Sequence, residues 1–101
     1  MGVQTASSTR EAIRVAGIGE MVVSNDMSQI LITYSLGSCI GVSLFDPQAG
    51  VGGLIHCMLP SSKMEAEKAA RRPCLYVDTG VIALLQAVMD LGAIGSRMTI
   101  K

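Results

Sequence analysis

The fold is decided by residues 40–59, which read IGVSLFDPQAGVGGLIHCML. Two apolar runs, Ile40–Phe45 and Val51–Leu59, lie on either side of the short segment Asp46–Gly50. That segment contains a proline and a glycine in the placement that is typical of a hairpin connection. The stretch therefore predicts two strands that are antiparallel neighbours in a sheet.

The same hairpin brings a thiol towards the only histidine of the chain. With the turn centred near Gln48, Cys39 lies opposite Met58 or Leu59. His56 then lies within about two or three residues of the level of the thiol, at roughly 3.4 Å per residue. The spacing therefore predicts that the thiol and the imidazole come within range of each other.

Upstream of the hairpin, apolar runs bounded by turn residues predict two further strands. The first covers Ala12–Gly19, is broken by glycines, ends at Glu20 and continues through Met21–Val23. The second covers Gln29–Ser35 and is bounded by the tight turn Leu36–Ser38. The thiol at the start of the hairpin therefore follows directly after a tight turn.

Downstream of the hairpin, residues 60–73 are rich in charge and predict a mobile surface loop with at most one helical turn. The next element is predicted to be an amphipathic helix. Its apolar stripe consists of Val81, Leu84, Leu85, Val88 and Leu91. Asp78 or Thr79 is expected to cap its start, and Gly92 to end it. Residues 96–101 predict the beginning of a last strand.

The composition predicts one small domain of the α/β class, of the α+β type. Half of the 101 residues are hydrophobic but only 3% are aromatic, which suits aliphatic packing between strands and a helix. We expect a layered sandwich of mostly antiparallel strands with a packed amphipathic helix. Residues 1–12 are expected to be a disordered lead-in, and residues 13–101 the domain. Eight basic residues balance eight acidic ones, which argues against binding to nucleic acid or to an anionic membrane.

The three cysteines, Cys39, Cys57 and Cys74, favour a reducing compartment. They form an odd set without a Cys-x-x-Cys pair, so neither a disulfide framework nor a Cys₃His zinc site is favoured. We therefore expect no metal, no cofactor and a cytoplasmic location. Cys57 is expected to face away from His56, because side chains alternate along a strand. The uncharged stretch Met27–Phe45 carries too many polar residues and glycines to favour a membrane span.

The residues around Cys39 provide the groups that thiol catalysis needs. A cysteine becomes a strong nucleophile beside an imidazole, and His56 is the only candidate base. A hydroxyl, a carbonyl or a carboxylate normally orients such an imidazole, and Thr33 lies on the strand that leads to the turn. The backbone N–H groups of Gly37 and Ser38 are candidates for stabilising an oxyanion. The predicted reaction is acyl transfer from an amide or ester through a thioester.

The chain carries five short motifs, in the order Gly17–Glu20, Thr33–Cys39, Asp46–Pro47, His56–Pro60 and Tyr76–Asp78. Together they resemble the CheD family of chemoreceptor glutamine deamidases, over most of residues 13–101. The pairing of Leu-Gly-Ser-Cys with His-x-Met-Leu-Pro is the most specific part of the resemblance. It implies Cys39 as the nucleophile, His56 as the base and Thr33 as the third member of the triad. It also implies a layered α/β fold similar to that of glutamine-deamidating bacterial toxins.

The activity that this resemblance implies is hydrolysis of the side-chain amide of specific glutamines on cytoplasmic chemoreceptor helices, which yields glutamate and ammonia. Some family members also hydrolyse glutamyl methyl esters, and some bind the phosphatase CheC, so a CheC-type phosphatase is a predicted partner. Because family members usually continue further, we expect the domain to be incomplete at its C-terminus. Two other functions stay open. One is a noncatalytic adaptor of the same fold that binds a chemoreceptor or a CheC-type phosphatase, and the other is a general thiol hydrolase of small amides.

Overall fold

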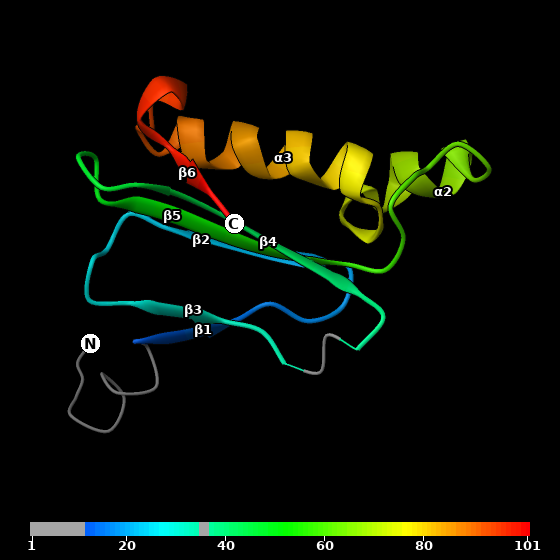
Figure 1. The fold of residues 1–101 in the computed structure, drawn as a ribbon, viewed down its shortest axis with the longest axis horizontal. Coiled ribbons are helices and arrows are strands. Elements are labelled where there is room, and N and C mark those ends of the chain that lie inside the picture. Colours follow the sequence, from blue (N-terminus) through cyan, green and yellow to red (C-terminus); the bar gives the residue numbers. More distant parts are fainter. Residues whose placement is uncertain (1–11, 35–36) are drawn as a thin grey trace.

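A computed structural model describes residues 12–34 and 37–101. Its elements are β1 (Ile13–Val15), β2 (Glu20–Ser24), β3 (Ile30–Ile32), β4 (Ile40–Asp46), β5 (Val51–Cys57), α2 (Ala66–Arg71), the 3₁₀ turn η1 (Pro73–Leu75), α3 (Val77–Asp90), the 3₁₀ turn η2 (Gly95–Arg97) and β6 (Thr99–Ile100). They form three layers, with a four-stranded sheet between α3 on one side and a two-stranded sheet on the other (Figure 1). This arrangement confirms the predicted layered fold of mostly antiparallel strands with a packed helix. The predicted lead-in, residues 1–12, lies outside the described residues except for Ala12.

The larger sheet is antiparallel, in the order β2-β5-β4-β6. At its centre is the predicted hairpin of β4 and β5. The connection ends at Gly50, whose φ of 69° is a conformation that glycine adopts without the steric cost of a Cβ. Ile40 pairs with Cys57 at the start of β4. If this register is extended by one residue, Cys39 lies level with Met58, as the sequence predicts.

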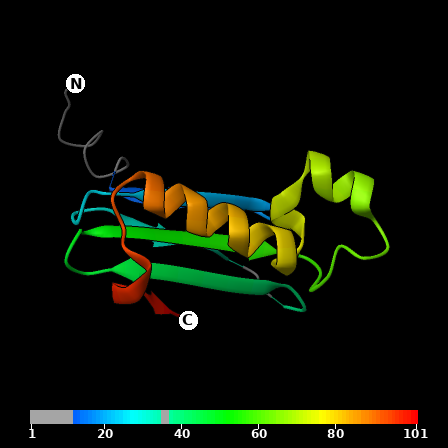
Figure 2. The ribbon, with the colours of Figure 1, turned by 90° about the horizontal axis from the view of Figure 1, so that it is seen from above.

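One face of this sheet is covered by α3, which packs mainly on β5 (Figures 1 and 2). Glycines permit the close approach, because a Cβ on Gly53 would lie 2.8 Å from side-chain atoms of Leu84 and Val88. A Cβ on Gly80 would likewise lie 2.7 Å from Ile55 Cδ1. The buried core between helix and sheet consists of Leu44, Val51, Ile55, Cys57, Cys74, Leu84, Val88 and Ala93. Removal of this apolar surface from water is what holds the helix on the sheet.

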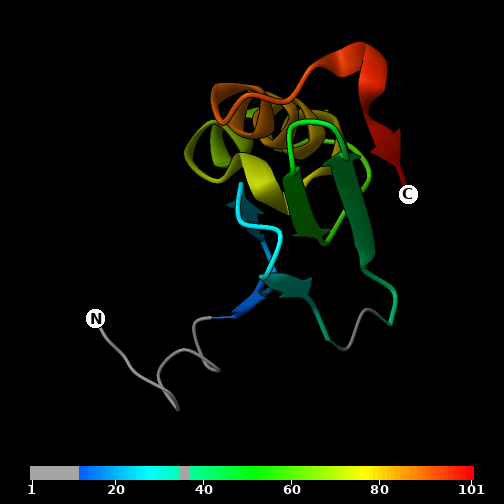
Figure 3. The same ribbon diagram turned by 90° about the vertical axis from the view of Figure 1, so that its left-hand side faces the viewer.

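The other face of the sheet carries the second, two-stranded layer, in which β1 and β3 run parallel (Figure 3). This layer corrects one prediction. The sequence predicts a single broken strand through residues 12–23, but the chain forms β1 and β2 there, and they belong to different sheets. A turn separates them, in which Glu20 N–H donates to the Gly17 carbonyl at 3.0 Å and Gly19 has a φ of 74°. The glycines therefore redirect the chain from one layer to the next.

Two further predicted elements have different bounds in the structure. The predicted strand Gln29–Ser35 forms only as β3, and its last residue lies outside the described residues. Residues 60–73, expected to be a loop with at most one helical turn, contain the six-residue helix α2. This helix is anchored because Ala69 is buried in a small apolar cluster with Leu75 and Tyr76.

The predicted amphipathic helix is present as α3, but its start and its exposed side differ from the prediction. Asp78 and Thr79 both lie inside the helix, and the residue at its N-cap is Tyr76, which makes no side-chain capping hydrogen bond. Asp78 Oδ1 does accept a hydrogen bond from a first-turn N–H, that of Thr79, at 2.9 Å. Leu85 and Leu91 are 37% and 36% exposed, because the helix contacts the sheet along a narrower face than the apolar stripe. Gly92, with a φ of 111°, follows the last turn as expected. Neither α3 nor any other helix in the described part of the chain is long and apolar enough to cross a bilayer.

Asp46 joins the hairpin to the C-terminal end of the chain. Its fully buried carboxylate accepts hydrogen bonds from the N–H groups of Gln48, Ala49 and Ile94 and from the guanidinium of Arg97. Burial acts to raise the pKa of Asp46, but the hydrogen bonds from Ile94 and Arg97 outweigh it and lower the pKa to about 2. This cluster lies at the end of β4 that also pairs with β6.

Candidate functional site

His56 lies on β5 and points away from α3. Its neighbours Ile55 and Cys57 face the core under the helix, so strand alternation turns the imidazole towards the second layer. Its partners across the adjoining strands are Glu20 of β2 and Gly41 of β4. Because the residue is only 1% exposed, partners for its ring nitrogens are expected among protein groups and not in bulk water.

Thr33, which follows β3, holds one side of the imidazole. Its Oγ1 lies 2.8 Å from His56 Nδ1, and its hydroxyl donates to the Ala16 carbonyl oxygen at 2.7 Å. Since the hydroxyl hydrogen is directed to Ala16, Oγ1 accepts from Nδ1–H, which assigns the neutral ring to the Nδ1-protonated tautomer. Among the described residues, the buried Nε2 has no hydrogen-bond partner.

Cys39 lies in the bend that leads into β4, and it is half-buried. Cys39 lies two residues before Gly41, which is the cross-strand partner of His56. Because side chains alternate along a strand, Cys39 and His56 are assigned to the same face of the sheet. Gly37 and Ser38 are exposed, and Gly37 has a φ of 47°. No hydrogen bond joins the N–H groups of these two residues to another described residue.

The turn from Gly17 to Glu20 supports His56 on its backbone side. Gly19 N–H donates to the His56 carbonyl oxygen at 2.7 Å, and Glu20 Oε1 accepts from Gly17 N–H at 2.9 Å. A Cβ at Gly19 would lie 2.6 Å from a side-chain atom of η1, so the turn fits closely against that segment. The sequence pattern predicts only a strand broken by glycines at this point, and nothing in it indicates a turn that contacts the histidine.

The chain segment that follows His56 is fixed against the start of α3. The N–H groups of Met58 and Leu59 both donate to the Leu75 carbonyl, at 2.8 and 3.1 Å. Val77 N–H donates in return to the Leu59 carbonyl at 2.9 Å. The motif His56–Pro60 is thus hydrogen-bonded to Val77, in the motif Tyr76–Asp78, and to Leu75, which comes directly before that motif.

The other two thiols belong to the core. Cys57 is fully buried and Cys74 is 9% exposed, both in the apolar cluster under α3. Burial, with a contribution from the neighbouring Cys74, raises the pKa of Cys57 to about 11. Burial also raises the pKa of Cys74. Both are therefore neutral thiols near pH 7, and Cys57 faces away from His56, as strand alternation predicts.

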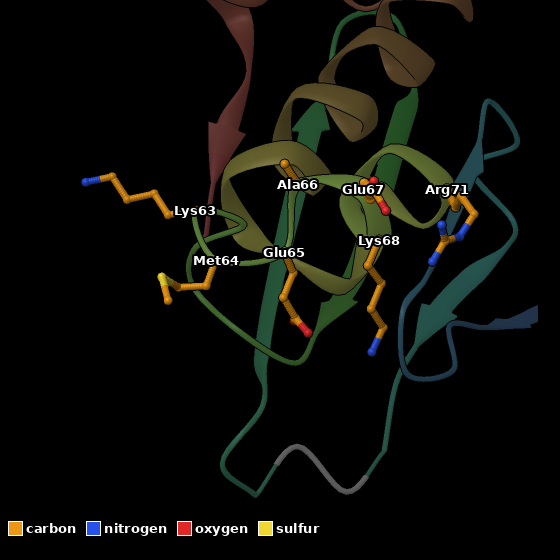
Figure 4. Close-up of a pocket in the computed structure, with 7 residues that line it drawn as sticks. All are labelled: Lys63, Met64, Glu65, Ala66, Glu67, Lys68 and Arg71. Atoms are coloured by element: carbon orange, nitrogen blue, oxygen red, sulfur yellow. The ribbon is translucent and has the colours of Figure 1, made fainter.

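A surface depression of about 470 Å³ lies around α2 and not at His56 (Figure 4). It is lined by Lys63, Met64, Glu65, Ala66, Glu67, Lys68 and Arg71. The long side chains spread away from the ribbon, and both glutamates and basic residues are among them. Such a surface is typical of a solvated helix. We therefore assign the candidate site from the geometry around the imidazole.

The sequence of this chain is similar to those of several curated proteins. No family model matches the chain. A protein of Syntrophus aciditrophicus, named "Probable chemoreceptor glutamine deamidase CheD 1", is 44% identical over 87 residues, which are 86% of this chain and 54% of the relative. Proteins of Solibacter usitatus and Pyrococcus abyssi, both named "Probable chemoreceptor glutamine deamidase CheD", are 38% and 43% identical. They align over 84 and 93 residues, which are 83% and 92% of this chain and 50% and 54% of the relatives.

These matches cover between 83% and 92% of this chain. The chain spans about half the length of the curated relatives it matches. Identities of 38–44% over more than 80 residues reflect common ancestry and not a shared short motif. On this similarity, the chain belongs to the CheD family.

Proposed function

We propose that this chain carries the catalytic groups of a cysteine-dependent glutamine deamidase. The observation that supports the proposal is the state of His56, a buried imidazole whose Nδ1 faces Thr33 and whose Nε2 has no partner among the described residues. A buried polar atom without a partner lowers stability, so its presence calls for a functional reason. Cys39 is half-buried on the same face of the sheet, and its thiol is the nucleophile that Nε2 would serve.

In the proposed reaction, His56 Nε2 removes the proton of the Cys39 thiol, and Sγ attacks the carbon of a glutamine side-chain amide. The oxyanion that forms accepts hydrogen bonds from the backbone N–H groups of Gly37 and Ser38. The imidazolium gives its proton to the amide nitrogen, the C–N bond breaks, and ammonia leaves a thioester. Water then attacks the thioester with Nε2 as the base, which yields glutamate and the free thiol.

Thr33 has the orienting role in this scheme. In a Ser-His-Asp triad the third group holds the imidazole in the correct tautomer and direction. The Thr33 hydroxyl, which donates to the Ala16 carbonyl, is arranged to do the same through Nδ1. Because it is neutral, it orients the ring without placing a second charge beside it.

The proposed substrates are glutamine side chains on chemoreceptor helices. The relatives described above carry the name "Probable chemoreceptor glutamine deamidase", and the groups around His56 suit attack on an amide. The proposed steps use only side chains, backbone N–H groups and water. A CheC-type phosphatase stays a predicted partner.

The test is to incubate the protein with receptor-helix peptides that contain glutamine, and to measure ammonia together with the mass change from Gln to Glu. Cys39→Ala and His56→Gln are expected to abolish both signals. Cys74→Ala, the matched removal of a buried thiol, is expected to retain them. Ammonia production that survives Cys39→Ala would overturn the proposal. Peptide binding without ammonia would instead support the noncatalytic adaptor, and equal turnover of free glutamine would support the general thiol hydrolase.

A further inference from the structure

Glu20 is the cross-strand partner of His56 and also closes the turn that supports it. We propose that Glu20 is a positioning residue for His56, and that it acts through the turn Gly17–Glu20. The inference rests on the proposed function, because positioning matters to the reaction only if Nε2 is the base. The position of the imidazole itself can nevertheless be measured without any turnover.

The first step of the argument is the way in which Glu20 closes its own turn. Glu20 N–H donates to the Gly17 carbonyl at 3.0 Å, and Glu20 Oε1 accepts from Gly17 N–H at 2.9 Å. The backbone N–H and the side chain of Glu20 thus pair with the carbonyl and the N–H of Gly17. The fit is tight, because a Cβ on Gly17 would lie 2.8 Å from Glu20 Oε1. Loss of the carboxylate would leave Gly17 N–H without this acceptor.

The second step is that this turn contacts His56 by two separate routes. Gly19, inside the turn, donates its N–H to the His56 carbonyl at 2.7 Å. Ala16, directly before the turn, accepts the hydroxyl of Thr33 at 2.7 Å, and Thr33 Oγ1 lies 2.8 Å from His56 Nδ1. A displacement of the turn therefore moves both the backbone of the histidine and the partner of its ring.

The third step separates positioning from a direct effect of charge. Among the described residues, the Glu20 carboxylate accepts its hydrogen bond from Gly17 N–H and not from the imidazole. The role then requires an acceptor oxygen at Oε1, and a glutamine supplies one without the negative charge. Glu20→Gln is therefore expected to keep the position of His56, whereas Glu20→Ala is expected to lose it.

The kinetic test compares Glu20→Ala, Glu20→Gln and the control Glu67→Ala, a change of an exposed residue on α2. We expect Glu20→Ala to lower kcat about tenfold with little change in KM, as a base that is less well placed loses part of its contribution. Glu20→Gln is expected to stay within about threefold of the parent protein, because it retains the acceptor. Equal losses in both Glu20 variants would overturn the positioning role in favour of a charge effect, and an unchanged Glu20→Ala would also overturn it.

The second measurement does not depend on activity. His56 is the only histidine in the chain, so nitrogen NMR of its ring reports the tautomer without an assignment problem. The parent protein and Glu20→Gln are expected to show the Nδ1-protonated form, and Glu20→Ala a mixture of the two neutral tautomers. A purely structural role would lower the melting temperature of Glu20→Ala but leave the tautomer unchanged, which would overturn the proposal. If the parent protein releases no ammonia while the tautomers change as expected, the proposed function fails and the positioning role stands.

Discussion

Thr33 Oγ1 and His56 Nδ1 lie 2.8 Å apart although the two residues are 23 positions apart in the chain. The contact joins the end of β3, in the small parallel layer, to the central strand β5 of the larger sheet. The two layers therefore meet at the imidazole. Anything that shifts one layer against the other would change the direction of the ring.

If the chain acts as the proposed deamidase, Thr33→Val is expected to lower the rate while leaving the fold intact. Valine has the shape of threonine but lacks the hydroxyl, so Nδ1–H would lose the acceptor that orients it. We expect kcat to fall by a factor between about ten and about one hundred, which is part of the roughly 10²–10⁴-fold contribution of a placed general base. Thr33→Ser keeps the hydroxyl and is expected to recover most of the rate. A Thr33→Val protein as active as its parent would contradict the orienting role.

Brief treatment with iodoacetamide near neutral pH is expected to modify Cys39 alone. Only a thiolate reacts, and with a pKa of about 11 Cys57 is a thiolate in less than about one molecule in a thousand at pH 7.5. The pKa of Cys74 is also raised by burial, while Cys39 is half-buried and so accessible to the reagent. Peptide mapping by mass spectrometry measures the sites. Rapid labelling of Cys57 or Cys74 in the folded protein would contradict the buried placement of these thiols.

Asp46 is expected to make the fold sensitive to acid. Its pKa of about 2 in the folded protein lies below the ordinary value of 3.8, so the native state binds fewer protons than the unfolded chain between these values. The carboxylate therefore stabilises the fold above about pH 4, and this stabilisation is lost as the pH falls through about 2.

Urea unfolding of the parent protein and of Asp46→Asn, followed from about pH 6 to about pH 2, measures this effect. The variant is expected to be less stable at neutral pH and to show a flatter pH dependence. Some dependence is expected to persist, because hydrogen bonds from Ser28 and Ser62 also lower the pKa of Asp26 and Asp78. The same slope in both proteins would refute the role given to Asp46.

Gly53→Ala is expected to destabilise the packing of α3 on β5. The added Cβ would lie 2.8 Å from atoms of both Leu84 and Val88, and these side chains are fully buried and cannot move aside freely. Overpacking of this kind costs about 1–3 kcal/mol of unfolding free energy. Gly95→Ala is the control, since the nearest atom to its Cβ, Met98 Cε, is 4.0 Å away. Urea denaturation of both variants checks the difference.

The sequence alone determined the elements whose causes are local. Two apolar runs around a Pro and Gly segment predicted the β4–β5 hairpin and the level of Cys39, and the periodic stripe from Val81 predicted α3. The same patterns indicated His56 as the only imidazole within range of that thiol. Strand alternation also assigned Cys57 to the opposite face. Each of these inferences needs only residues that are close in the chain.

Tertiary structure alone decided the surroundings of the imidazole. That Ala16 accepts the hydroxyl of Thr33, that Gly19 donates to His56, and that β1 and β2 belong to different sheets all depend on how layers pack. The same holds for Asp46, whose partner Arg97 lies 51 residues further along the chain. Hydrophobic periodicity shows which face of an element is buried, but not which element covers it. A hydrogen bond between distant segments forms only once that packing has set its donor and acceptor side by side.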